Sequence, residues 1–158
     1  DRSLTEIGDR TLLMAYVHIG HDSRVGNDTI LVNNTALAGH VEVGDWAILS
    51  GYTLVHQFCK IGAHSFSGMG TSIGKDVPAY ITVAGSPAEA KTINVEGLRR
   101  RGFDSAEIAA LRRAFKILYR QSLTLDAAVE RLQAMAAETP SLQPLIDSLM
   151  QSQRGIVR

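Results

Sequence analysis

The side chains best suited to chemistry are five histidines, all within the first 64 residues: His18, His21, His40, His56 and His64. An imidazole titrates close to neutral pH and is also the commonest metal ligand in proteins. Asp22, directly after His21, adds a carboxylate to this set. If the fold gathers these residues, they suit proton transfer or metal binding; otherwise they are ordinary surface residues. The single cysteine, Cys59, excludes an internal disulfide and a cysteine-rich zinc site.

A six-residue repeat determines where these side chains lie. One column of the repeat is aliphatic at all but one position: Ile7, Leu13, Ile19, Val25, Leu31, Leu37, Val43, Leu49, Val55, Ile61, Ser67 and Ile73. The column four residues later contains only small or β-branched residues, from Thr11 to Thr71. A hexapeptide period is typical of a parallel β-helix. The strands of a β-sandwich, in contrast, alternate with period two and are separated by irregular loops. We therefore predict a parallel β-helix.

Glycines indicate the size of one coil. They follow the aliphatic position every 18 residues, at Gly8, Gly26, Gly44 and Gly62, so three hexapeptides form one triangular coil. The same interval places three residues above one another in successive coils, about 4.8 Å apart: His21, Gly39 and Gln57.

None of the histidines falls in an inward column, so we expect no core histidine. His40 and His56 flank the column of His21, and His18 stands at the preceding corner, which predicts that these four gather on one edge of the prism. A metal site is a rival interpretation, but the histidines occupy different columns and no second carboxylate joins Asp22. Chance clustering of surface histidines is the other alternative.

The composition changes near residue 93. Residues 1–93 contain 11 of the 14 glycines and all the histidines, whereas residues 94–158 are rich in Ala, Leu, Arg and Gln. This contrast matches strand and helix propensities, so we expect a β-helix over 1–93 and an α-helical domain over 94–158. Amphipathic patterns predict three helices, beginning after Ser105, after Thr124 and at Ser141.

The charge balance limits the partners. Sixteen basic and sixteen acidic residues leave no net charge, which argues against general affinity for nucleic acid or an anionic membrane. No run of 18 apolar residues is present. We therefore expect a cytoplasmic protein without stable membrane insertion. The basic excess after residue 93 would suit an acidic protein partner.

Four segments carry a resemblance to a known family: residues 13–22 (LMAYVHIGHD), 33–40 (NNTALAGH), 55–59 (VHQFC) and 94–103 (NVEGLRRRGF). Together they resemble the acyl-ACP:UDP-N-acetylglucosamine O-acyltransferases of lipid A biosynthesis, collinearly and over nearly the whole chain. The resemblance implies a left-handed β-helix, additional N-terminal coils before Asp1, and a homotrimer with sites between neighbouring prisms. It also implies a Gram-negative bacterium, acyl carrier protein and UDP-N-acetylglucosamine as substrates, and no cofactor beyond the carrier's phosphopantetheine thioester.

The resemblance assigns roles residue by residue. His21 corresponds to the general base, Asp22 to the residue that orients it, and Gly39 to the backbone donor for the oxyanion. The substrate-positioning residues are His18, His40, His56 and Gln57, and those at the nucleotide and diphosphate are Asn94, Glu96, Arg100 and Arg101. Met69 corresponds to the position that stops the acyl chain, which implies a donor near ten carbons rather than fourteen. No metal is implied, and Cys59, in an inward column, is expected to pack rather than to act as a nucleophile.

Two alternatives remain at this point. One is a hexapeptide acyltransferase with another acceptor or an acyl-CoA donor, and the other is a noncatalytic or metal-bearing β-helix scaffold.

Overall fold

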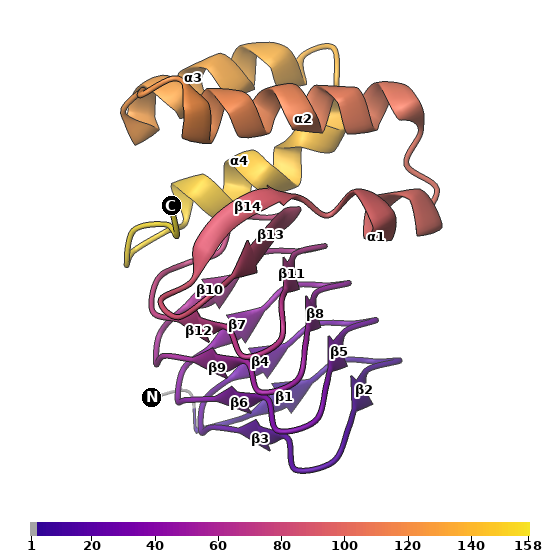
Figure 1. Cartoon of the computed structure of the whole chain (residues 1–158), viewed down its shortest axis with the longest axis vertical. Coiled ribbons are helices and arrows are strands. Elements are labelled where there is room, and N and C mark those ends of the chain that lie inside the picture. The colour runs from indigo at the N-terminus through magenta and orange to yellow at the C-terminus, as the bar shows by residue number, and fades with distance from the viewer. Residues whose placement is uncertain (1–2) are drawn as a thin grey trace.

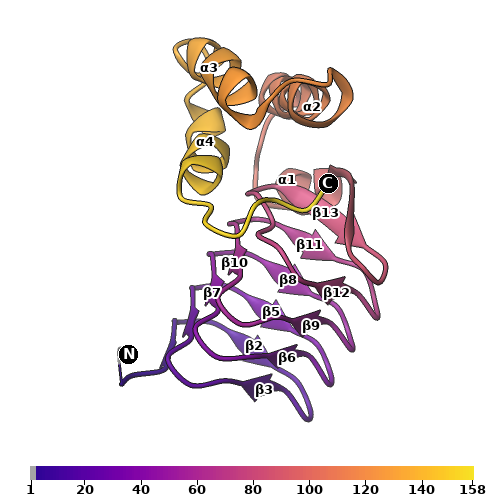
Figure 2. The same ribbon diagram turned by 90° about the vertical axis from the view of Figure 1, so that its left-hand side faces the viewer.

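The computed structural model describes residues 3–158, and its first half is a stack of triangular coils (Figures 1 and 2). Each coil contributes a two-residue strand to each of three parallel faces. Face A contains β1 (Glu6–Ile7), β4 (Arg24–Val25), β7 (Glu42–Val43) and β10 (Lys60–Ile61). Face B contains β2 (Leu12–Leu13), β5 (Ile30–Leu31), β8 (Ile48–Leu49) and β11 (Phe66–Ser67). Face C contains β3 (His18–Ile19), β6 (Ala36–Leu37), β9 (Leu54–Val55) and β12 (Ser72–Ile73).

The 18-residue coil predicted from the glycine spacing is confirmed by the strand register. Strands pair in parallel with the residue one coil later, as in Ile7 with Val25 and Leu37 with Val55. The chain rises with a left-handed sense from the N-terminal coil to the helices above (Figures 1 and 2). The fold is the left-handed parallel β-helix with C-terminal helices that the sequence predicts.

The two predicted inward columns fill the prism. Leu31, Leu37 and Leu49 are at most 1% exposed. The buried hydroxyl of Thr53 donates to the carbonyl of Ser50 at 2.6 Å. The first coil departs from this pattern, because Ile7 is 49% exposed at the N-terminal end of the prism, where no described coil packs beneath it. The 18-residue glycines permit close stacking: a Cβ on Gly62 would lie 2.2 Å from the backbone nitrogen of Ala79.

The repeat ends after β12. The next strand, β13 (Ile81–Ala84), still stacks in parallel on face B, but Phe66 pairs with Thr82, so this coil is two residues shorter. β14 (Glu89–Ile93) then returns antiparallel to β13 and ends the strand region.

The helices of the described chain lie above the last coil, and after them residues 151–158 return to it as an irregular segment in which Ile156 bridges Asp76 (Figures 1 and 2). The helices are α1 (Val95–Arg100), α2 (Ser105–Arg120), α3 (Leu125–Ala136), the 3₁₀ helix η1 (Pro140–Leu142) and α4 (Gln143–Met150). The helices after Ser105 and Thr124 are confirmed; a capping box between Asp104 and Glu107 begins α2, and Thr124 caps α3. The third is confirmed, but its start differs: Ser141 lies within η1, which leads directly into α4 at Gln143. No described helix combines the length and apolarity needed to cross a bilayer.

Candidate active site

The three corners of the prism carry the side chains with chemical capacity. We name each corner by the faces it joins: C–A (residues 21–22, 39–40 and 57–58), A–B (27–28, 45–46 and 63–64) and B–C (15–16, 33–34, 51–52 and 69–70). The second residue of each corner adopts a left-handed conformation, with φ near +60° at Asp22 and His40. Its N–H donates to the coil below, as His40 does to the carbonyl of His21 at 2.9 Å. This repeated bond stacks the corners and fixes the columns of side chains.

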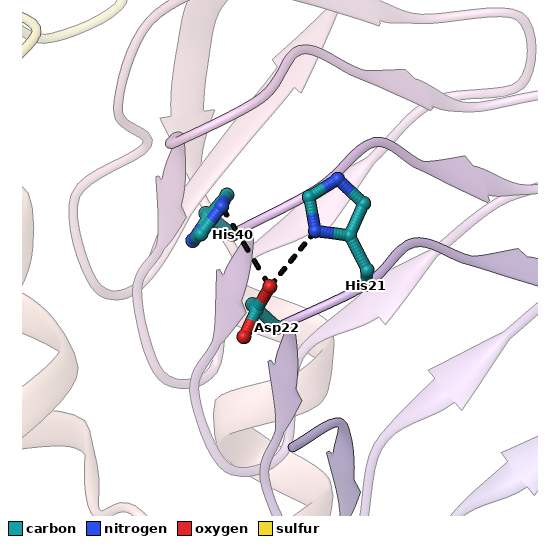
Figure 3. A group of neighbouring side chains, drawn as sticks. All are labelled: His21, Asp22 and His40. Carbon is teal, nitrogen blue, oxygen red and sulfur yellow. Dashed lines mark hydrogen bonds and ion pairs between the residues drawn. The ribbon is translucent and has the colours of Figure 1, made fainter. Parts of the chain in front are cut away.

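The C–A corner brings together His21, Asp22 and His40 (Figure 3). Oδ2 of Asp22 lies 2.9 Å from Nδ1 of His21 and 3.8 Å from Nε2 of His40, and the two imidazoles meet edge to face at 5.0 Å. The Asp22 side chain is 8% exposed, whereas that of His21 is 75% exposed. Because a carboxylate only accepts hydrogen bonds, its contact places a proton on Nδ1 of His21, and in the neutral form of that ring the lone pair is on Nε2. The buried carboxylate therefore orients an accessible base.

Gly39 lies directly against this base. A Cβ at Gly39 would stand 2.6 Å from Nε2 of His21, so the stack of His21 and Gly39 predicted from the repeat is confirmed, and a side chain at Gly39 would displace the ring. At the A–B corner, the corresponding N–H of Asn27 donates to Oδ1 of Asp45 at 2.8 Å. Within residues 3–158 no acceptor takes the N–H of Gly39. The corner thus presents a backbone donor beside the Nε2 lone pair.

The same three side chains are the group in the described chain that could hold a metal ion, because their ligand atoms lie within 4.8 Å of one another. The group has two imidazoles and one carboxylate, and that carboxylate already contacts Nδ1 of His21.

The other two histidines of the predicted cluster lie on the adjoining face. His18 and His56 line a hollow of about 430 Å³ over face C, whose floor is formed by small and apolar residues that include Ala36, Ala38 and Leu54. Gln57 is exposed at the C–A corner, and its carbonyl contacts Nδ1 of His56 at 3.1 Å. The four histidines therefore do not form the single cluster expected, but two neighbouring pairs. His21 and His40 contact each other, and His18 and His56 line the hollow beside them.

Met69 lies at the far edge of face C, at the B–C corner. This residue is 80% exposed, and the following Gly70 N–H donates to the carbonyl of Gly51 one coil below. Face C thus separates the corner of His21 from the corner of Met69.

A second hollow, of about 680 Å³, lies over face B beneath α1. It contains the four residues expected at a nucleotide: Asn94, Glu96, Arg100 and Arg101. Asn94 caps α1 by accepting from the N–H of Gly97 at 3.1 Å, and Nε of Arg100 contacts Oε1 of Glu96 at 3.0 Å. Ile30, Ile48 and Phe66 form an apolar wall.

His64 lies outside the prism core and is only partly buried, as expected, but it is packed among aromatic side chains on the outer surface of the prism. Its ring stacks on Tyr80 at 5.4 Å and meets Phe103 edge-on at 5.4 Å. Its Nδ1 lies 3.1 Å from Nη1 of Arg101. Burial, then the charge of Arg101, lowers the pKa of His64 to about 4. The repeat placed His64 outside the prism correctly, but Phe103 covers it from beyond the repeat.

The two sets of residues lie on opposite sides of one prism. The C–A corner of a triangle faces away from face B, which carries Asn94 and Arg101. The hollow that contains Arg101 shares no residue with the corner of His21 or with the hollow of His56.

Cys59 is fully buried in the prism, as expected for an inward column. Burial raises the pKa of its thiol to about 11, so the thiolate that a nucleophile requires is disfavoured at neutral pH.

Comparisons with known proteins match both halves of the chain. Residues 76–157 match the family of UDP N-acetylglucosamine O-acyltransferase, domain 2, and residues 4–39 match the bacterial transferase hexapeptide family. The whole chain is 66% identical to the acyl-[acyl-carrier-protein]–UDP-N-acetylglucosamine O-acyltransferase of Ectopseudomonas mendocina and spans 61% of that protein. Solved UDP-N-acetylglucosamine O-acyltransferases are also similar. That of Moraxella catarrhalis has a TM-score of 0.97 and 43% identity, with all of this chain and 62% of the other covered. That from Acinetobacter baumannii has a TM-score of 0.94 and 46% identity, with 96% of this chain and 59% of the other covered.

Proposed function

The chain belongs to the family of UDP-N-acetylglucosamine O-acyltransferases, and we propose that it provides the acyl-transfer site of such an enzyme. The proposed reaction moves a 3-hydroxyacyl chain from acyl carrier protein to the 3-hydroxyl of UDP-N-acetylglucosamine, the first step of lipid A biosynthesis, in the cytoplasm. The observation that carries this proposal is the C–A corner, where Nε2 of His21 lies against Gly39 and Asp22 holds the opposite ring nitrogen.

The proposed mechanism uses that corner directly. Nε2 of His21 takes the proton of the sugar hydroxyl while the oxygen attacks the thioester carbonyl. The N–H of Gly39 donates to the oxyanion of the tetrahedral intermediate. When the intermediate collapses, the C–S bond breaks and the imidazolium returns the proton to the departing phosphopantetheine thiolate. Asp22 stabilises the imidazolium between these steps. The reaction balances without a metal, a redox cofactor or an acyl-enzyme, and Cys59 has no part in it.

The proposed site needs two copies of the chain. His21 and the Asn94–Arg101 group lie on opposite sides of one prism, so one substrate reaches both only if a neighbouring copy supplies the second set. We propose a homotrimer in which the C–A corner of one copy faces the face B hollow of the next. Asn94, Glu96, Arg100 and Arg101 would then hold the nucleotide and diphosphate, because guanidinium groups pair well with phosphates. His18, His40, His56 and Gln57 would position the sugar and the acyl chain.

We propose that the acyl carrier docks on the helical domain. The exposed face of α2 is basic and displays four cations: Arg112, Arg113, Lys116 and Arg120. An acidic carrier protein would be attracted to this face, and rim charges of this kind act mainly on the rate of association.

A transfer assay tests the proposed function. The full-length protein is incubated with a 3-hydroxyacyl carrier protein and UDP-N-acetylglucosamine, and the acylated sugar nucleotide is quantified by mass spectrometry. We expect His21→Ala to lower kcat by roughly 10²- to 10⁴-fold without loss of the fold. Cys59→Ala is the matched control and should keep kcat within about twofold, because a buried thiol that reacts with nothing contributes only packing.

Two outcomes would contradict the proposal. Normal turnover by His21→Ala would show that His21 is not the general base. Preference for acyl-CoA as donor, or for another acceptor, would place the protein in the alternative class of hexapeptide acyltransferases.

A further inference from the structure

An aromatic stack at the A–B corner lies beside Arg101, a residue of the face B hollow. Trp46, His64 and Tyr80 occupy this corner in three successive coils, with neighbouring rings nearly parallel. The His64 ring lies 6.3 Å from Trp46 and 5.4 Å from Tyr80, and Phe103, which follows α1, closes the stack from the side. This arrangement holds the imidazole of His64 in one orientation.

Arg101 is the charged group against this stack. Its Nη1 lies 3.1 Å from Nδ1 of His64, and its guanidinium carbon lies 5.3 Å from the centre of the Trp46 ring. A guanidinium only donates hydrogen bonds, so Nδ1 of His64 must be the acceptor and the imidazole is neutral with its proton on Nε2. Burial and the nearby cation keep it neutral at physiological pH by lowering the pKa of His64 to about 4.

His64 also contacts the hollow through its backbone. Its carbonyl accepts from Nδ2 of Asn94 at 3.0 Å, and Oδ1 of Asn94 in turn caps α1 through Gly97. One residue of the β-helix is thus bonded to both Asn94 and Arg101, at the two ends of α1.

We propose that His64 is a positioning residue, whose neutral imidazole accepts from Arg101 and holds that guanidinium over Trp46, facing a nucleoside diphosphate in the hollow. A free arginine side chain must give up rotamer freedom when it binds a phosphate, whereas one already fixed does not. The diphosphate therefore binds a preorganised donor. This inference rests on the proposed function only in taking a nucleotide sugar as the ligand.

A double-mutant cycle tests the inference in the full-length protein. His64→Phe keeps a stacking ring but removes the acceptor, Arg101→Ala removes the donor, and His64→Gln offers an amide oxygen as a substitute acceptor. The readouts are the KM for UDP-N-acetylglucosamine, kcat, and the Kd of UDP by calorimetry. Tyr80→Phe is the control, because it alters the same stack by removing a hydroxyl that contacts Ser141 rather than Arg101.

We expect His64→Phe to raise the KM and the UDP Kd about 5- to 30-fold while kcat changes less than about twofold. In the Arg101→Ala background the same change should add less than about twofold. His64→Gln should recover part of the affinity, and Tyr80→Phe should leave it unchanged. Thermal unfolding of each variant distinguishes a lost fold from a lost contact.

The possible failures are distinguishable. If Arg101→Ala raises the KM but His64→Phe does not, or if the two effects simply multiply, His64 does not act through Arg101 and this inference is wrong. If Arg101→Ala itself leaves UDP binding unchanged, the nucleotide role of Arg101 in the proposed function is wrong, and the role of His64 is wrong with it.

Discussion

The contact between His21 and Gly39 joins the two groups that the proposed chemistry needs. The repeat alone places both residues in one column, so the sequence was sufficient to predict their stacking. It could not predict that Nε2 would be the nitrogen facing Gly39, because ring orientation depends on the buried oxygen of Asp22. His64 was missed as a contact of Arg101 because Phe103 and Arg101 lie outside the repeat, and no six-residue spacing relates them to it.

Gly39→Ala is the sharpest test of this contact. The added Cβ would lie 2.6 Å from Nε2 of His21, so the ring must shift away from the position where it meets the hydroxyl. We expect kcat to fall by roughly 10²-fold or more, since small displacements of catalytic groups have effects of this size. The measurement is steady-state turnover with thermal unfolding alongside. Turnover within a few-fold of wild type in a folded variant would show that position 39 tolerates a side chain.

The stability of the protein should depend on pH through His64. Its pKa is lowered to about 4 in the folded state from an ordinary value of 6.5. The unfolded chain therefore binds the extra proton first, so this contribution is complete above pH 6.5 and is lost as pH falls toward 4. After allowance for partial exposure, we expect about 1–2 kcal/mol of unfolding free energy to be lost. Denaturant unfolding of wild type and His64→Phe at pH 7 and pH 4.5 measures it. An equal loss in both proteins would contradict the assignment.

Among the elements, the strands were the most predictable, because each needs only one inward aliphatic residue and one small one every six positions. α1 was not predicted, since its six residues depend on the cap that Asn94 provides. The start of α4 was misplaced because the 3₁₀ helix η1 leads directly into it, and the sequence pattern does not separate the two. The attachment of the helices to the coils depends on single residues distant in sequence, which a periodic pattern cannot indicate.

Asp76 is the clearest of these attachments. It is 3% exposed, and its carboxylate accepts from the N–H of Lys60 in face A and from Ser152, Gln153 and Arg154 after α4. Asp76→Ala would remove the buried acceptor of four part-buried hydrogen bonds, so we expect the free energy of unfolding to fall by about 2–4 kcal/mol. Denaturant titration measures this loss, with the exposed Asp126→Ala on α3 as control. A loss as small as that of the control would show that the carboxylate does not hold the C-terminal segment.

At the scale of the whole molecule, face C provides a path between the proposed base and Met69. Its outward residues Ala36 and Leu54 form a largely apolar strip that ends near the B–C corner. If a neighbouring copy covers this strip, the acyl chain would lie along it and its methyl end would meet the exposed Met69 side chain.

Met69→Gly should therefore relax the selection of chain length. A bulky side chain that must be displaced costs about 1–3 kcal/mol, or roughly 5- to 150-fold in selectivity. We expect wild type to prefer a 3-hydroxyacyl donor near ten carbons and the variant to accept fourteen carbons as well or better. Competition between the two donors measures the ratio. The same ratio in both proteins would mean that Met69 does not limit the chain.

Complementation between a variant without the base and a variant with weakened nucleotide binding tests the central claim most directly. That claim is an acyl-transfer site in which His21 of one copy works with Arg101 of the next. His21→Ala and Arg101→Ala chains are co-expressed with different affinity tags, and oligomers containing both are purified and assayed at low UDP-N-acetylglucosamine. In a cyclic trimer of mixed chains, one of the three interfaces keeps both native residues, so the account predicts recovery of up to about one third of wild-type activity. Activity no greater than that of the two variants assayed separately would contradict it.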